Sequence, residues 1–187
     1  VVNAMTVDVE DYFQVSAFEP HLDRRDWNDH SFRVEGNTER ILELFAAHDV
    51  QGTFFTLGWV AERFPSLIRK IVDNGHELAS HGWEHIRVSA QSPEEFRADV
   101  SRTRRRLEDI SGQAVTGYRA ASYSIGAAET WAWRELAIRT SRSNRFNANK
   151  FEVLLSSMCE ASAFRVRLAI QVSRGESRIS FNYRAGG

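Results

Sequence analysis

Short apolar runs alternate with amphipathic helical stripes along the first two thirds of the 187-residue chain, and this alternation constrains the fold most. Runs of strand length occur at residues 3–9, 52–57, 76–80 and 114–118. Continuous apolar runs of this length are typical of buried parallel strands. Strands separated by helices predict βαβ units and an α/β fold with a parallel sheet, either open or closing as a barrel. A complete eightfold barrel needs about 250 residues, so any barrel in this chain is partial or has fewer units.

Capping residues mark the ends of the helices between these runs. Ser92 at the N-cap, Pro93 at the first helical position and Glu95 two positions later form a capping box, and Gly112 ends that helix. An apolar stripe at steps of three and four residues between them predicts an amphipathic helix.

Two earlier helices are marked less sharply. Asn37 and Thr38 supply an N-cap for a helix that carries Ile41, Leu42 and Phe45 on one face. The second covers residues 60–72, and Pro65 should kink or restart it.

Charge is divided unevenly along the chain. Of the 24 Lys and Arg residues ten lie in residues 134–187, but of the 25 Asp and Glu residues only four do. The first 133 residues therefore hold 14 basic and 21 acidic side chains. This shift predicts a boundary, with a domain over residues 1–133 and a basic tail over residues 134–187 that is not its natural continuation.

Overall composition excludes several classes of protein. The formal net charge of −1 gives no global basic field for nucleic acid, and no apolar run is long enough for a transmembrane helix. A single cysteine rules out a disulfide within the chain. No basic, apolar leader opens the sequence, which favours a cytoplasmic location.

Polar side chains follow three of the predicted strands. Asp8, Glu10 and Asp11 lie at the end of the first, His81 and His85 follow the third, and Arg119 follows the fourth. Because catalytic and binding residues lie at the carboxyl ends of parallel strands, we expect these groups to meet at that rim of the sheet. His76 lies at the other end of its strand, which favours a structural role.

The two histidines of residues 81–85 have the spacing of a metal-binding pair. Their side chains share one face if the segment is helical, and in a loop Gly82 lets the backbone curl back. Two neutral imidazoles and one carboxylate suit zinc, cobalt or nickel and leave a coordination position open for water. The alternative is two unrelated surface histidines.

The three carboxylates lie close enough in the sequence to repel one another. In an extended strand Asp8 and Glu10 point to one side and Asp11 to the other. A cation would relieve their repulsion, with one carboxylate as its ligand and another free as a base; the alternative is a solvated acidic strand end. Arg119 either pairs with the free carboxylate or is an ordinary surface residue.

Four segments resemble the polysaccharide deacetylases, the NodB-homology group or carbohydrate esterase family four. Residues 6–11 (Thr-Val-Asp-Val-Glu-Asp) resemble a variant of the first motif, and residues 52–58 resemble the second strand. Residues 75–85 are similar to the second motif with its metal histidines, and residues 117–122 resemble the third motif. The residue pattern of the first motif is most similar to that of the bacterial subgroup associated with exopolysaccharide and exosortase loci. The resemblance covers residues 3–133.

The resemblance implies a partial, distorted (β/α) barrel and metal-dependent removal of N-acetyl groups from an amino-sugar polysaccharide. It implies Asp8 as general base, Arg119 as the residue that orients it, and a divalent cation, zinc, held by His81, His85 and Glu10 or Asp11. We prefer Glu10 because it shares a face with Asp8.

Two departures from the family pattern concern the later part of the chain. Ala121 stands where the third motif has proline, and no histidine follows His85, although the family supplies a late histidine as general acid. The closing strands of the barrel are not recognisable either. We therefore expect an incomplete copy of a deacetylase; the alternative is a metal- or glycan-binding module without turnover.

Overall fold

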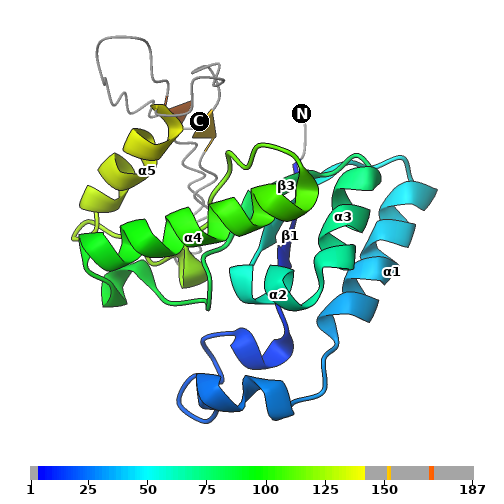
Figure 1. Ribbon diagram of the computed structural model, residues 1–187, viewed down its shortest axis with the longest axis horizontal. Coiled ribbons are helices and arrows are strands. Elements are labelled where there is room, and N and C mark those ends of the chain that lie inside the picture. The colour runs from blue at the N-terminus through cyan, green and yellow to red at the C-terminus, as the bar shows by residue number, and fades with distance from the viewer. Residues whose placement is uncertain (1–3, 142–150, 153–168, 171–187) are drawn as a thin grey trace, which may run out of the picture.

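The computed structural model describes residues 4–141, 151–152 and 169–170 (Figure 1). Within them, three strands form a parallel sheet: β1 (Met5–Val9), β2 (Gly52–Thr56) and β3 (Glu77–Ser80). The α-helices are α1 (Val34–Ala47), α2 (Gly58–Arg63), α3 (Pro65–Asp73), α4 (Pro93–Ser111) and α5 (Trp131–Ser141). Short 3₁₀ helices occupy the connections: η1 (Tyr12–Gln14), η2 (Arg24–Asp29), η3 (Val88–Ala90) and η4 (Ala121–Tyr123).

The helices follow one another in the same order as the strands. The strand order is β1-β2-β3, while α1 contacts α3, α3 contacts α4, and α4 contacts α5 (Figure 1). Parallel strands, each followed by helical segments that pack beside one another, are the repeating units of a (β/α) barrel. The described sheet is thus a section of such a barrel rather than a closed one.

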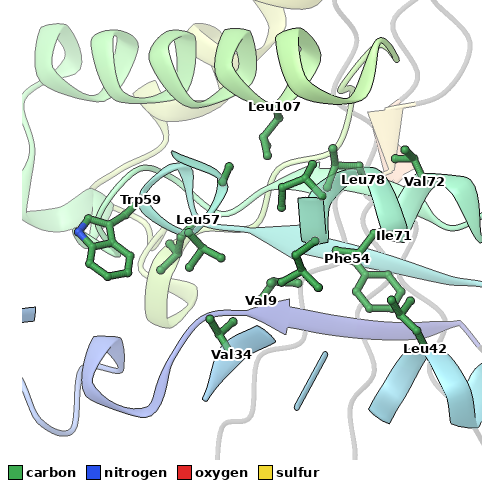
Figure 2. Close-up of a cluster of buried hydrophobic side chains, with 14 of the residues drawn as sticks. Val9, Val34, Leu42, Phe54, Leu57, Trp59, Ile71, Val72, Leu78 and Leu107 are labelled. Carbon is green, nitrogen blue, oxygen red and sulfur yellow. The ribbon is translucent and has the colours of Figure 1, made fainter. Parts of the chain in front are cut away.

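The main core lies between the sheet and the helices. Phe54 of β2, Leu78 of β3 and Leu107 of α4 point into one buried cluster (Figure 2). Because side chains alternate along a strand, Asp8, Phe55 and Ala79 point to the opposite face, and they lie side by side in register across β1, β2 and β3. The sheet therefore has one apolar face toward the helices and one face that carries Asp8.

The predicted fourth strand, residues 114–118, is wrong as a strand. Only a single parallel bridge joins Tyr118 to Ser80, flanked by N–H···O=C bonds from Ser80 to Gly117 and from Arg119 to Ser80, both 2.9 Å. Upstream, the Val115 N–H donates instead to Glu108 of α4 at 3.0 Å. The segment is thus held by the helix as well as by β3, yet it still brings Arg119 to the sheet.

Helix ends agree with the sequence where the capping signal is local. The capping box of Ser92 and Glu95 is present, and Gly112 ends α4 in the left-handed conformation. Pro65 separates α2 from α3, as the restart prediction requires.

The predicted start of α1 at Asn37 and Thr38 is wrong. The helix begins at Val34, because the Asp11 carboxylate accepts hydrogen bonds from the N–H groups of Arg33 and Val34 at 2.7 and 3.0 Å. A cap from 22 residues away in the sequence gives no local signal.

Helix α5 crosses the predicted boundary after Trp133. Leu136 is buried in a second apolar cluster that also contains Phe96 of α4 and Ala132. Beyond Ser141 the structure describes just β4 (Phe151–Glu152) and β5 (Ala169–Ile170), which pair as antiparallel strands. The rest of the tail prediction for residues 134–187 lies outside the described residues. Among the helices that are described, none has the length and apolar character needed to cross a bilayer.

Candidate metal centre

Five of the six predicted site residues meet at the carboxyl end of the sheet. Asp8 and Glu10 come from the end of β1, His81 directly follows β3, and His85 follows it by one loop. Arg119 reaches the same place from the bridge at Tyr118, crossing the Phe55 ring at 4.0 Å to pair with Asp8.

Glu10, His81 and His85 form a compact triangle of possible ligand atoms. Glu10 Oε2 lies 3.3 Å from His85 Nε2 and 3.9 Å from His81 Nε2, and one ligand atom of each residue lies within 4.8 Å of the others. Ligand atoms about 2.0–2.2 Å from a shared zinc ion are themselves about 3–4 Å apart. The spacing of the triangle therefore fits one divalent cation.

Burial favours the neutral form of each of these three groups in the absence of a cation. Burial and the neighbouring Asp8 raise the pKa of Glu10 to about 7, while burial and the neighbouring His81 lower the pKa of His85 to about 4. Burial also lowers the pKa of His81. The close approach of Glu10 to His85 is thus not an ion pair at neutral pH, and Glu10 Oε2 is buried without a hydrogen-bond partner. A cation would supply the missing partner.

The tautomer of His81 leaves the correct nitrogen free for a metal. Its Nδ1–H donates to the carbonyl oxygen of Arg119 at 2.9 Å, because a carbonyl can only accept. The lone pair of Nε2 then faces Glu10. Such a bond from the far nitrogen of an imidazole to a backbone carbonyl is a common support for metal-binding histidines.

The loop between the two histidines is held at every backbone group of Gly82 and Trp83. Their N–H groups donate to Ser80 Oγ at 3.3 Å and Asp99 Oδ1 at 2.8 Å, and their carbonyls accept from Gly58 and Trp59 at 2.9 and 3.0 Å. Gly82 and His85 have positive φ angles of 79° and 54°. The loop form of the histidine pair, with Gly82 as its turn, is therefore the one that occurs.

Asp99 is a site residue that the sequence did not reveal. It lies on the buried side of α4, between Phe96 and Thr103, and burial raises its pKa to about 6. The Arg102 guanidinium stacks on the Trp83 ring at 3.4 Å. The available signal was an acid on the apolar stripe of an amphipathic helix, where an ordinary solvated acid does not belong.

Asp8 stands next to the triangle without being part of it. Its Oδ1 pairs with Arg119, and its Oδ2 lies 4.0 Å from His81 Nε2. Arg119 also donates to Thr6 Oγ1 at 2.9 Å. These contacts fix the Asp8 carboxylate with one oxygen toward Arg119 and the other toward the histidines.

Asp11 does not join the triangle, so the geometry favours Glu10 between the two carboxylates considered as ligands. Asp11 is 2% exposed, and both of its oxygens accept backbone N–H groups: Oδ1 from Tyr12, and Oδ2 from Arg33 and Val34 at the start of α1. Asp11 instead caps the starts of η1 and α1, and these hydrogen bonds hold its carboxylate away from the triangle. Metal binding by any of these residues stays a prediction.

Trp59 and Trp83 are both buried. Trp59 packs edge-on against Trp27 at 5.4 Å between ring centroids, and Trp83 lies beneath Arg102. Their role in the described structure is core packing. His76 is also buried, as its structural interpretation requires.

A family model described as polysaccharide deacetylase matches residues 26–141. The chain belongs to the polysaccharide deacetylase family. The match includes His81, His85 and Arg119, but it begins after the first motif, so the structure alone places Asp8 and Glu10 beside them.

Curated relatives share part of the chain. A peptidoglycan-N-acetylglucosamine deacetylase from Bacillus cereus is 32% identical over 77 residues, which cover 41% of this chain and 28% of the relative. A chitooligosaccharide deacetylase from Bradyrhizobium is 33% identical over 88 residues, covering 47% and 40%. The chain thus matches less than half the length of these relatives.

Solved structures agree on the fold. A Mycobacterium smegmatis protein assigned to the polysaccharide deacetylases is 27% identical with a TM-score of 0.61, covering 73% of this chain and 47% of that one. A Bacillus anthracis pseudoenzyme of carbohydrate esterase family four is 27% identical with a TM-score of 0.51, covering 54% and 36%. The predicted fold, an incomplete (β/α) barrel of the deacetylase type, is confirmed.

Proposed function

We propose that this chain carries the metal centre and general base of a deacetylase that removes N-acetyl groups from an amino-sugar polysaccharide. The observation that carries the proposal is the Glu10–His81–His85 triangle with the Asp8 carboxylate 4.0 Å from one of its nitrogens. A ligand set and a separate carboxylate at one rim are what metal-assisted hydrolysis requires.

Zinc is the cation that the donor set favours. Two neutral imidazoles and one carboxylate, with a further position open, are typical of catalytic zinc sites. A divalent cation bound by Glu10, His81 and His85 would polarise an acetyl carbonyl and lower the pKa of a bound water. Glu10, raised in pKa when the site holds no cation, would bind as the carboxylate.

Asp8 is the group placed to accept the proton of the attacking water. Its Oδ2 is the oxygen left over after Oδ1 has paired with Arg119. Arg119 in turn is held by Thr6 and by the face of Phe55, so it orients Asp8 rather than contacting the substrate. A fixed carboxylate within reach of the reacting water is the geometric requirement for general base catalysis.

The substrate class rests on the relatives. Their names specify N-acetylglucosamine of peptidoglycan in one case and chitooligosaccharide in the other. We therefore propose an oligomer or polymer of N-acetylated amino sugar as the substrate, with the exopolysaccharide subgroup as the more specific hypothesis.

A second candidate is binding of metal and glycan without turnover. No histidine follows His85 in these 187 residues, so the late general acid that the family resemblance implies has no counterpart in this sequence. The similarity to a Bacillus anthracis pseudoenzyme points in the same direction.

Acetate release separates the two candidates. The full chain is loaded with zinc and incubated with N-acetylglucosamine oligomers, and chelator-treated protein serves as the matched control. Acetate release that depends on zinc supports the deacetylase. Stoichiometric zinc binding and binding of the oligomers, with no acetate release above the chelated control, support the binding module instead.

A further inference from the structure

The first turn of α2 lies directly against the loop that joins the two histidines. Gly58, the first residue of α2, donates its N–H to the Gly82 carbonyl at 2.9 Å. The Trp83 ring occupies the space on the side where a Cβ atom would lie: such an atom would be 2.3 Å from Trp83 Cε3 and 2.9 Å from two further ring atoms. A side chain at position 58 therefore requires the ring to move.

Close approach, and not backbone conformation, is what requires glycine at position 58. Gly75, Gly82 and Gly112 have positive φ angles, whereas Gly58 does not. Its backbone would therefore accept any residue, and only the Trp83 ring excludes a side chain. Glycine commonly occupies positions where other groups pack directly against the backbone.

A displaced Trp83 ring would take the loop with it. The residue is 8% exposed, and the Arg102 guanidinium lies 3.4 Å from the ring centroid. Its backbone is bonded on both sides, since its N–H donates to Asp99 Oδ1 at 2.8 Å and its carbonyl accepts from Trp59 at 3.0 Å. In such a close-packed setting an added carbon atom shifts both side chains and backbone.

His85 is the candidate ligand that depends on this loop. His81 is held by the sheet itself, because its N–H donates to the carbonyl of Thr56 in β2 at 3.0 Å. His85 follows Trp83 by two residues and has a φ of 54°, a conformation that is disfavoured for a residue with a side chain. The surrounding loop must maintain this conformation, which keeps His85 Nε2 3.3 Å from Glu10 Oε2.

We propose that Gly58 and Trp83 form a positioning pair that holds His85 where it can share a cation with Glu10 and His81. Neither member contacts the ion or the substrate, and both act through the loop. The contact between α2 and the Trp83 ring thereby determines how tightly the cation is held. This inference rests on the proposed function and adds to it a support of the metal centre.

Gly58→Ala adds the single carbon atom that the ring excludes. We expect zinc affinity to fall by about 10–100-fold, the range typical of removing a support of a metal ligand. Gly36→Ala is the matched control, because it makes the same exchange in the first turn of α1, where an added Cβ meets nothing within 4 Å. Its zinc affinity should equal that of the wild type. Calorimetric titration of the full chain measures both, and chemical denaturation checks that each variant is folded.

Removing the ring tests whether the effect passes through Trp83. Trp83→Leu frees the space over Gly58 but leaves the loop without its aromatic support, so it should itself weaken zinc binding about tenfold. In that background Gly58→Ala should change zinc affinity by no more than about twofold, because the ring that it displaces is gone. Trp83→Phe, which keeps an aromatic ring, should bind zinc more tightly than Trp83→Leu.

Two readouts distinguish positioning from a general loss of stability. In the metal-free chain the imidazole resonances of His85 should shift in Gly58→Ala, while those of His76 at the other end of β3 should not. With cobalt(II) in place of zinc, the visible absorption bands depend on coordination geometry. These bands should change in Gly58→Ala and stay unchanged in Gly36→Ala.

Wild-type zinc affinity in Gly58→Ala overturns the proposal. An equal loss on adding Gly58→Ala to the wild type and to Trp83→Leu overturns it as well. If Gly58→Ala does not fold, Trp83→Leu decides: wild-type zinc affinity with unshifted His85 resonances overturns the proposal, and lowered affinity with shifted resonances supports it.

Acetate release is measured on the same samples, so that the two proposals fail separately. The predicted coupling between Gly58 and Trp83 without any acetate release refutes only the deacetylase. Acetate release and zinc affinity that are unchanged in Gly58→Ala and Trp83→Leu refute only the positioning pair. A wild-type chain that binds no zinc overturns both.

Discussion

His76 and His81 lie at opposite ends of β3, five residues apart, and both are almost fully buried. His76 Nδ1 accepts the Gly52 N–H at 3.4 Å, and its ring packs between Phe45 and Phe54. His81 Nδ1 donates to a carbonyl, and its Nε2 faces Glu10 and Asp8. Burial is therefore shared, and the difference lies in which nitrogen remains available and what surrounds it.

This contrast extends to the two ends of the sheet. Toward the amino end, the buried polar group of His76 is surrounded by aromatic rings. At the carboxyl end Glu10, His81 and His85 are gathered in one place, and Glu10 Oε2 has no partner. Groups that cost stability without a ligand are the usual sign of a functional site.

Exchanging the two histidines for alanine, one at a time, should give the largest difference. His81→Ala should lower zinc affinity by more than about 100-fold, since removing even a residue that only hydrogen-bonds to a metal ligand lowers metal affinity by about 10–100-fold. His76→Ala should leave zinc affinity unchanged and lower the free energy of unfolding by about 1–3 kcal/mol. Calorimetric zinc titration and chemical denaturation test both, and equal zinc affinity in all three proteins would contradict the contrast.

Asp8→Asn distinguishes the proposed general base from the proposed zinc ligands at the carboxyl end of the sheet. The amide keeps the size of the side chain but cannot take up a proton, so any zinc-dependent acetate release should fall by about 10²–10⁴-fold. Zinc affinity should remain near that of the wild type. If zinc binding is lost instead, Asp8 is a metal ligand and the assignment of roles is wrong.

Asp99→Leu tests whether the loop between the histidines depends on its carboxylate. Loss of the acceptor for the Trp83 N–H should lower zinc affinity by about 10–100-fold, as for other supports of metal ligands. Thr103→Val, one turn further along the same buried face of α4, is the matched control and should bind zinc normally. If both variants lose affinity equally, the effect comes from the helix and not from Asp99.

Asp99→Asn should have a smaller effect, on stability. Burial raises the pKa of Asp99 from 3.8 to about 6, so between about pH 4 and 6 the folded state binds more protons than the unfolded state. This group's contribution to stability therefore falls as pH rises through that range. Above pH 6 the variant should be about 1–3 kcal/mol more stable than the wild type, with no difference near pH 4. Parallel denaturant titrations at pH 4 and 7 measure this, and a variant that is less stable at pH 7 would contradict it.

Sequence reasoning identified the features that depend on neighbouring residues. The capping box at Ser92, the restart at Pro65 and the turn at Gly82 each follow from a few adjacent side chains. Features that depend on distant contacts were missed. The α1 start is set by Asp11, and the position of Trp83 is set by Asp99, which only the folded chain brings near.

The candidate site shows the same division. The same-face rule for Asp8 and Glu10 identified the carboxylate that lies with the histidines, because strand alternation is local. Asp11 is held by a local capping box with Gln14 at the start of η1 and by the start of α1, and only the second contact has no local pattern in the sequence.

Location of a bound zinc ion tests the central claim most directly. Crystals of the full chain grown with zinc, with anomalous diffraction measured on both sides of the zinc edge, show which side chains hold the ion. The account predicts one strong peak within about 2.0–2.2 Å of Glu10 Oε2, His81 Nε2 and His85 Nε2, with Asp8 and Asp11 outside that distance. A peak bound by Asp11, or no peak between the two histidines at full zinc loading, would contradict it.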